Sequence, residues 1–316
     1  MTSTPVHALP VTTASPARGG RRGLFGTLAR LESLRLARHP VLISATVIGL
    51  IATTTALIRS AGPATDEAFV LPDVASTVGI AAMLSAYYLT RSFSRADELL
   101  EASPTSSTNR TAALCVTAVV PALIASLWLV IHYGVRPAAL AVPEWMYGTF
   151  SHADIAAVLV GNSVVAAVGG TLLGVAAGRW WGFRGAFAVL VLAMVVWTMG
   201  VLGAFSSSDT APPAWTRWFR LFVPFGIFTS AAPDNTSVLS LTGSPRWYAA
   251  WLVTLCALAA VAALLWRSEG RTRRRVVRAG AVTLALSVLT YGLAVSGGLS
   301  QPVRTFTDGH SVVVTK

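Results

Sequence analysis

Long apolar runs alternate with short polar segments over most of the 316-residue chain. Each run is close to the roughly 20 residues that an α-helix needs to cross the hydrocarbon core of a bilayer. The runs are Val41–Ile58, Phe69–Thr90, Thr111–Val135, Ile155–Gly178, Gly185–Phe205, Trp247–Trp266 and Ala279–Gly298. This pattern predicts an all-α membrane protein, a helical bundle with seven transmembrane helices.

A shorter amphipathic segment, residues 23–39, precedes the first run. Its apolar side chains fall on one half of a helical wheel, while Arg22 and Arg30 fall on the other half. The apolar side chains are Leu24, Phe25, Leu28, Leu31 and Leu34. We expect this helix to lie on the inner membrane surface, where its arginines meet anionic lipid. Residues 1–22 are rich in Pro, Thr and Ala and lack periodicity, which predicts a disordered basic tail. A cleaved signal peptide is the competing interpretation, but the charged region is too long for one and the next apolar run has the length of a span.

A second amphipathic element is expected between the fifth and sixth runs. After Pro212 and Pro213 four aromatic side chains share one narrow helical face, and Arg217 and Arg220 point away from it. The aromatic residues are Trp215, Trp218, Phe219 and Phe222. Aromatic side chains gather at headgroup level, so this segment predicts an interfacial or shallow re-entrant helix. A folded soluble insert is the less favoured interpretation.

The last segment, residues 299–316, is β-prone. Asp308 and Gly309 form a turn signal before a short apolar run that is typical of a strand. Two such short pieces cannot form a core of their own. We therefore expect an extracytoplasmic tail that either pairs with another subunit or begins a further domain.

Composition supports the membrane class, and charge orients the chain. The sequence is 54% hydrophobic and 12% charged, whereas soluble domains average about 45–50% and 25%. Most arginines lie before the first run and in the connectors after the second, fourth and sixth runs. Basic residues are retained on the cytoplasmic side. The expected location is the cell (plasma) membrane, with the N-terminus cytoplasmic and the C-terminus extracytoplasmic.

Several kinds of chemistry are excluded or disfavoured by the residues present. Lys316 is the only lysine in the chain, so no P-loop of the form GxxxxGK[ST] exists. The histidines are scattered without metal-ligand spacing. Cys115 and Cys256 both lie in apolar runs, where a thiol is usually a small hydrophobe. We expect no catalytic residue, cofactor or metal in this chain, no nucleic-acid partner, and ATP hydrolysis only in another subunit.

Inside the runs, small and kinking residues predict how the helices pack. Gly170, Gly174 and Gly178 recur at every fourth position and predict a groove for a neighbouring helix, with a substrate path as the alternative. Pro121 predicts a kink in the third run, because proline removes one ladder hydrogen bond. Asp73 and His132 are each near the outer end of a run, where they can reach interfacial water.

The connector between the second and third runs, Arg91–Arg110, combines mixed charge with an apolar centre. Ser94 can cap a short helix in which Asp97 and Glu98 face the positive end of the helix dipole. Pro104 ends that helix. The apolar pair Leu99 and Leu100 is surrounded by Arg95, Glu98 and Glu101. This arrangement suits docking onto another protein, and a solvated loop is the alternative.

These features together resemble the permeases of the type-2 ABC exporter family over roughly Leu24 to Trp266. Glu98, Leu99, Leu100 and Pro104 match the family's acid, leucine pair and proline. The glycine usual upstream of the acid is absent, with Arg95 near its place, and a seventh run follows the expected six. The resemblance implies a six-span permease-like domain at 40–266, followed by a basic cytoplasmic loop and seventh span at 267–298.

The resemblance also implies partners. A separate ATP-binding subunit, holding ATP and magnesium, would dock on the connector as on a coupling helix, and the permease would form a homodimer or heterodimer in contact with membrane lipids. The expected function is export of a hydrophobic or amphipathic substrate. The alternative is a membrane scaffold or sensor that docks a cytoplasmic partner without transporting anything. A proton-coupled carrier is weaker, because no run carries an acid near its middle.

Overall fold

The computed structural model describes residues 18–59, 75–95, 106–135, 151–183, 185–206, 229–231, 237–240, 244–296, 303–306 and 311–313. Helices make up most of this part of the chain. They are α1 (Arg18–Ala37), α2 (Pro40–Arg59), η1 (Ala75–Gly79), α4 (Ile80–Arg95), α6 (Ser107–Val116), α7 (Val119–Val135), α9 (His152–Val160), η3 (Gly161–Val165), α10 (Ala166–Trp180), α11 (Ala186–Ser206), α13 (Pro245–Leu265) and α14 (Gly270–Ser296). The segments η1 and η3 are π-helical.

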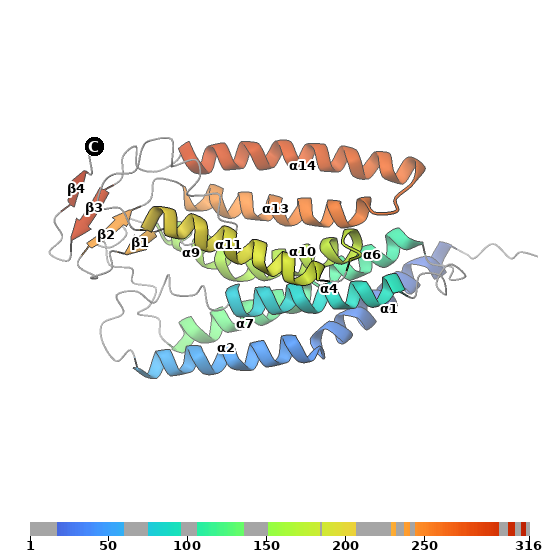
Figure 1. The fold of residues 1–316 in the computed structure, drawn as a ribbon, viewed down its shortest axis with the longest axis horizontal. Helices are drawn as coiled ribbons and strands as arrows, with labels where there is room; N and C mark the ends of the chain where they lie inside the picture. The colour runs from blue at the N-terminus through green and yellow to red at the C-terminus, as the bar shows by residue number, and fades with distance from the viewer. Residues whose placement is uncertain are drawn as a thin grey trace, which may run out of the picture.

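The long helices lie side by side in an elongated bundle (Figure 1). One end carries four short strands and the start of α9, and we call it the sheet end. The opposite end carries the start of α6 and the turn between α13 and α14. We call it the basic end, because Arg91, Arg110, Arg179 and Arg267 lie near the helix termini there.

Four helical segments of the described chain are long and apolar enough to cross a membrane, or up to five if a bent pair is counted as one span. The four are Ser107–Ile131, His152–Trp180, Pro245–Leu265 and Gly270–Ser296, and the bent pair is Leu24–Ala37 with Pro40–Ala52. All seven apolar runs expected from the sequence contain helix. The helical bundle of a multi-pass membrane protein is therefore observed, with four to five candidate spans.

The amphipathic helix α1 begins at Arg18, five residues before the expected start. It meets α2 at a bend of 54°. Leu24, Leu31 and Leu34 are exposed, whereas the side packed into the bundle carries Ala29, Glu32 and Leu36. The leucine stripe therefore faces away from the protein, as suits contact with lipid. A different face, which includes a glutamate, makes the contact with the bundle.

The third apolar run is interrupted between α6 and α7. Thr117 and Ala118 are in a turn, and the amide of Val120 donates to the carbonyl of Thr117 at 3.0 Å, a three-residue spacing. Pro121 follows directly and has no amide hydrogen to continue the four-residue ladder. The break therefore lies where Pro121 predicts a kink.

Three glycines bring α10 against α4. A Cβ atom built on Gly170 would meet the carbonyl oxygen of Gly79, and one on Gly174 would meet that of Met83. At Gly178 it would lie 2.7 Å from the Cβ atom of Thr90. Only residues without a side chain permit this approach of two backbones. The spacing of four residues thus forms the contact between these two helices.

The strands pair into one small antiparallel sheet in the order β1 (Thr229–Ala231), β2 (Ser237–Ser240), β3 (Val303–Phe306) and β4 (Ser311–Val313). The strands of the tail were expected to pair with another subunit or to begin a further domain. Instead β3 pairs with β2 of the same chain, with Ser237 opposite Phe306 and Ser240 opposite Val303. The bundle is all-helical, and the sheet lies beyond its end (Figure 1).

Candidate functional site

The expected docking segment is framed by the ends of α4 and α6. Arg95 is the last residue of α4, and α6 starts after the N-cap residue Ser106, whose Oγ accepts from the amide of Asn109 at 3.3 Å. Glu98, Leu99, Leu100, Glu101 and Pro104 lie outside the described residues. So do the interfacial residues Trp215, Trp218, Phe219 and Phe222. Asp73 and the side chain of His132 are also outside them.

Both ends of this segment are held by neighbouring elements. Arg91 Nη2 donates to the carbonyl oxygen of Gly182 at 2.7 Å, which ties the end of α4 to the residues after α10. The first helix α1 packs along α6, and Leu36 and Leu114 are buried in one core cluster. The two helix ends that flank residues 96–105 are thus both anchored at the basic end of the bundle.

Arg110, in the first turn of α6, has two desolvated donors. Its Nε and Nη1 atoms are buried, with no hydrogen-bond partner within the described part of the chain. A guanidinium N–H that has left water without gaining an acceptor is unfavourable. Arg110 therefore offers a place for an acceptor, most effectively a carboxylate or phosphate oxygen.

A second group of cations joins α10 to α13 at the same end. The Arg179 guanidinium lies over the Trp266 ring at 4.8 Å, and the Arg267 guanidinium lies 4.6 Å from the same ring centroid. Trp180 Nε1 also donates to the carbonyl oxygen of Ala262 at 2.7 Å. Beyond the turn, the start of α14 exposes Arg271, Arg273, Arg274, Arg275 and Arg278. The exposed arginines of α14, together with exposed Arg267 before it, therefore give the basic end a strongly positive surface.

Glu32 is a buried carboxylate in this positive region. It is 4% exposed, Arg35 Nη1 donates to its Oε1 at 3.3 Å, and its Oε2 is buried without a hydrogen-bond partner among the described residues. Burial raises the pKa of Glu32 above its usual range, and Arg35 offsets only part of that effect. The sequence pattern did not identify Glu32, since a lone acid on a helix gives no sign of which face is buried.

Replacing Glu32 by glutamine should remove a pH dependence of stability. Because burial raises the pKa of Glu32 in the folded protein, the protonated form is favoured there. Its contribution to stability is present below the ordinary value of 4.5 and is lost as pH rises through the raised value. Thermal unfolding of the chain in lipid nanodiscs between pH 4 and pH 8 measures this. The wild type should lose stability with rising pH more steeply than Glu32→Gln, and equal slopes would contradict the burial of an ionisable group.

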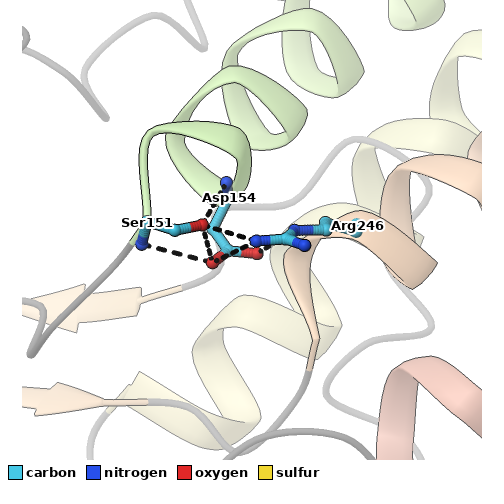
Figure 2. A network of polar contacts seen from close by, with 3 residues as sticks. All are labelled: Ser151, Asp154 and Arg246. Carbon is cyan, nitrogen blue, oxygen red and sulfur yellow. Dashed lines mark hydrogen bonds and ion pairs between the residues drawn. The ribbon is translucent and has the colours of Figure 1, made fainter.

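At the sheet end a polar network joins the starts of α9 and α13 (Figure 2). Ser151 and Asp154 form a capping box, in which Ser151 Oγ accepts from the Asp154 amide and Asp154 Oδ2 accepts from the Ser151 amide. Arg246 adds three contacts, from Nε to Asp154 Oδ1 at 2.9 Å, and from Nη2 to Ser151 Oγ at 2.6 Å and to Asp154 Oδ2 at 3.4 Å. The capping box has a recognisable sequence spacing, but no local signal connects it to Arg246.

Polar side chains also lie in the middle of the helical segment His152–Trp180, within η3. Asn162 is 7% exposed and Ser163 is fully buried. Ser163 Oγ donates to the carbonyl oxygen of Leu159 at 2.5 Å, while Asn162 Oδ1 is buried with no partner in the described ranges. About ten residues, or 15 Å of helix, separate Asn162 from the start of α9, which is half the thickness of the hydrocarbon core. The sequence analysis did not single out these residues.

The described residues form two kinds of feature, namely contacts between helices and a positively charged surface. In these ranges no three His, Cys, Asp or Glu side chains are grouped so that they could hold a metal ion. Cys115 and Cys256 are free thiols. Comparisons with protein families, curated proteins and solved structures find no match to this chain. The chemistry that the basic end can perform is the binding of an acidic surface or anionic lipid.

Proposed function

We propose that this chain is the membrane-spanning permease subunit of an ATP-binding cassette exporter. The observation that carries the proposal is the frame around residues 96–105, where α4 ends and α6 begins, both in contact with α1. A mixed-charge connector held at both ends can transmit movement from a docked protein into two membrane helices. At its edge, Arg110 has two buried donors without a partner in the described part of the chain, and an acidic group that reached them would be bound.

Six helices, α2, α4, α6 with α7, α9 with α10, α11 and α13, form the permease domain, and α14 is a seventh span. A separate ATPase binds ATP and magnesium and docks on Glu98, Leu99 and Leu100. Two permease chains, identical or different, form the translocation unit. Since few charged side chains are buried among the described residues, the substrate is hydrophobic or amphipathic.

The alternative proposal is a membrane scaffold or sensor, and the same positive surface supports it. Such a protein would dock a cytoplasmic partner without coupling ATP hydrolysis to movement. Co-purification of the full chain from its native membrane in mild detergent separates the two functions. An associated ATPase whose turnover depends on the chain supports export, whereas a stable partner without ATPase activity supports the scaffold.

The proposed orientation places the basic end in the cytoplasm, because basic residues are retained on that side. Single cysteines at Ser244, before α13, and at Thr272, in the first turn of α14, test it in a background lacking Cys115 and Cys256. In intact cells an impermeant thiol reagent should label Ser244→Cys and should label Thr272→Cys only after the membrane is permeabilised. The reverse pattern would show that the basic end is outside.

A further inference from the structure

The helical segment His152–Trp180 consists of two main parts with different surroundings. The outer part, α9, has nine residues, and His152, Ala153, Ala156 and Val160 on it are exposed. The second part, α10, is buried along almost its whole length, from Ala166 to Arg179. The glycine contact fixes α10 against α4, and α10 also packs along α13. The α10 part is therefore embedded on nearly all sides, whereas α9 buries only one face, with Val158 and Leu159, and packs that side along α13.

The joint between the two parts is the π-helix η3. A π-helical turn departs from the four-residue hydrogen-bond ladder, and such turns often mark positions where a helix changes shape. Asn162 lies in this joint, and its buried Oδ1 lacks a partner in the described chain. An unsatisfied buried acceptor destabilises the conformation that contains it. Within the described chain, the observed arrangement of the joint therefore leaves one acceptor that a rearranged joint could satisfy.

Among the described residues, the ion pair between α9 and α13 lies at the far end of α9. Arg246 reaches Ser151 and Asp154 there, and its side chain remains 58% exposed, against 19% for Asp154 (Figure 2). Ion pairs with one exposed partner are weak and compete with water. The attachment can therefore be released without disturbing the core, because the capping box of α9 does not need Arg246.

We propose that α9 is a lever, hinged at η3 and latched to α13 by the contact of Arg246 with Ser151 and Asp154. Release of the latch moves α9 away from α13 while α10 keeps its position against α4. This movement opens the bundle at the sheet end and exposes residues buried beneath α9. The lever follows from contacts within this chain alone. Its role as the extracytoplasmic release route rests on the proposed export function, and the test below requires neither a partner nor transport.

The test uses buried valines on the two sides of the hinge. Val158 of α9 is 3% exposed and Val175 of α10 is 0% exposed. Each is replaced by cysteine in a full-length chain carrying Cys115→Ala and Cys256→Ser, in lipid nanodiscs. The rate of modification by a charged methanethiosulfonate reagent is then measured with and without Arg246→Gln. We expect Val158→Cys to react about three- to tenfold faster when the latch is removed, and Val175→Cys to keep its rate.

Two further variants make the result specific. Arg246→Lys retains the positive charge and should give an intermediate rate at Val158→Cys. Asn162→Leu removes the unsatisfied acceptor from the latched state and should slow that reaction. An unchanged rate at Val158→Cys in Arg246→Gln would overturn the lever. Equal acceleration at both positions would overturn it too, since it would show that the whole bundle loosens.

Discussion

Gly174→Ala should separate α10 from α4 and destabilise the bundle by about 3 kcal/mol, near the upper end of overpacking effects. The added Cβ atom would overlap the carbonyl oxygen of Met83. That obstacle is backbone, so no rotation of a side chain can remove the overlap. The two helices must move apart along a contact that also includes Gly170 and Gly178. Denaturation with SDS in mixed micelles, followed by circular dichroism, measures the loss.

Gly292→Ala is the matched control for this substitution. Gly292 lies in α14, and a Cβ atom built there meets nothing within 4 Å. Alanine is the better helix former by about 1 kcal/mol, so this variant should be slightly more stable than the wild type. If Gly174→Ala and Gly292→Ala had the same stability, the close contact between α4 and α10 would be wrong.

Leu99→Ala combined with Leu100→Ala should weaken the binding of the proposed ATPase by about 100-fold or more. Burying two leucine side chains in a partner contributes roughly 3 to 5 kcal/mol before ordering costs, and each 1.4 kcal/mol is tenfold in affinity. The chain should still insert and fold, because these residues belong to the connector and not to the bundle. Titration of the purified ATPase onto nanodisc-bound chain measures the affinity.

The control removes two leucines that face away from the bundle. Leu284 and Leu289 of α14 are 55% and 57% exposed, and Leu284→Ala with Leu289→Ala makes the same chemical change without touching the connector. This control should keep the affinity of the wild type. Undiminished binding by the connector variant would mean that residues 96–105 are a solvated loop, as the alternative interpretation holds.

The helices were predictable from the sequence because their signals are local. A bilayer fixes the length of an apolar helix, and the predicted run Trp247–Trp266 differs from α13 by one or two residues at each end. The glycine spacing of α10 is also a local pattern, since residues four apart share one helix face. Pro121 marks the break between α6 and α7 through a local effect too, because proline has no amide hydrogen for the helix ladder.

Features that depend on distant residues could not be predicted. Arg246 meets Asp154 across 92 positions, and no local pattern links the two. The pairing of β3 with β2 joins residues on either side of α13 and α14, whereas a turn signal describes only one strand and its neighbour. In α1 the leucine stripe was apparent, but its outward orientation depends on the packing of α6 against the other face.

The most direct test of the export proposal is the ATP turnover of the co-purified partner, measured in the same lipid vesicles with and without this chain. The proposal predicts that wild-type chain changes the turnover severalfold, that Leu284→Ala with Leu289→Ala behaves like the wild type, and that Leu99→Ala with Leu100→Ala behaves like vesicles without the chain. Identical turnover in all four preparations would contradict the proposal that residues 96–105 couple this chain to ATP hydrolysis.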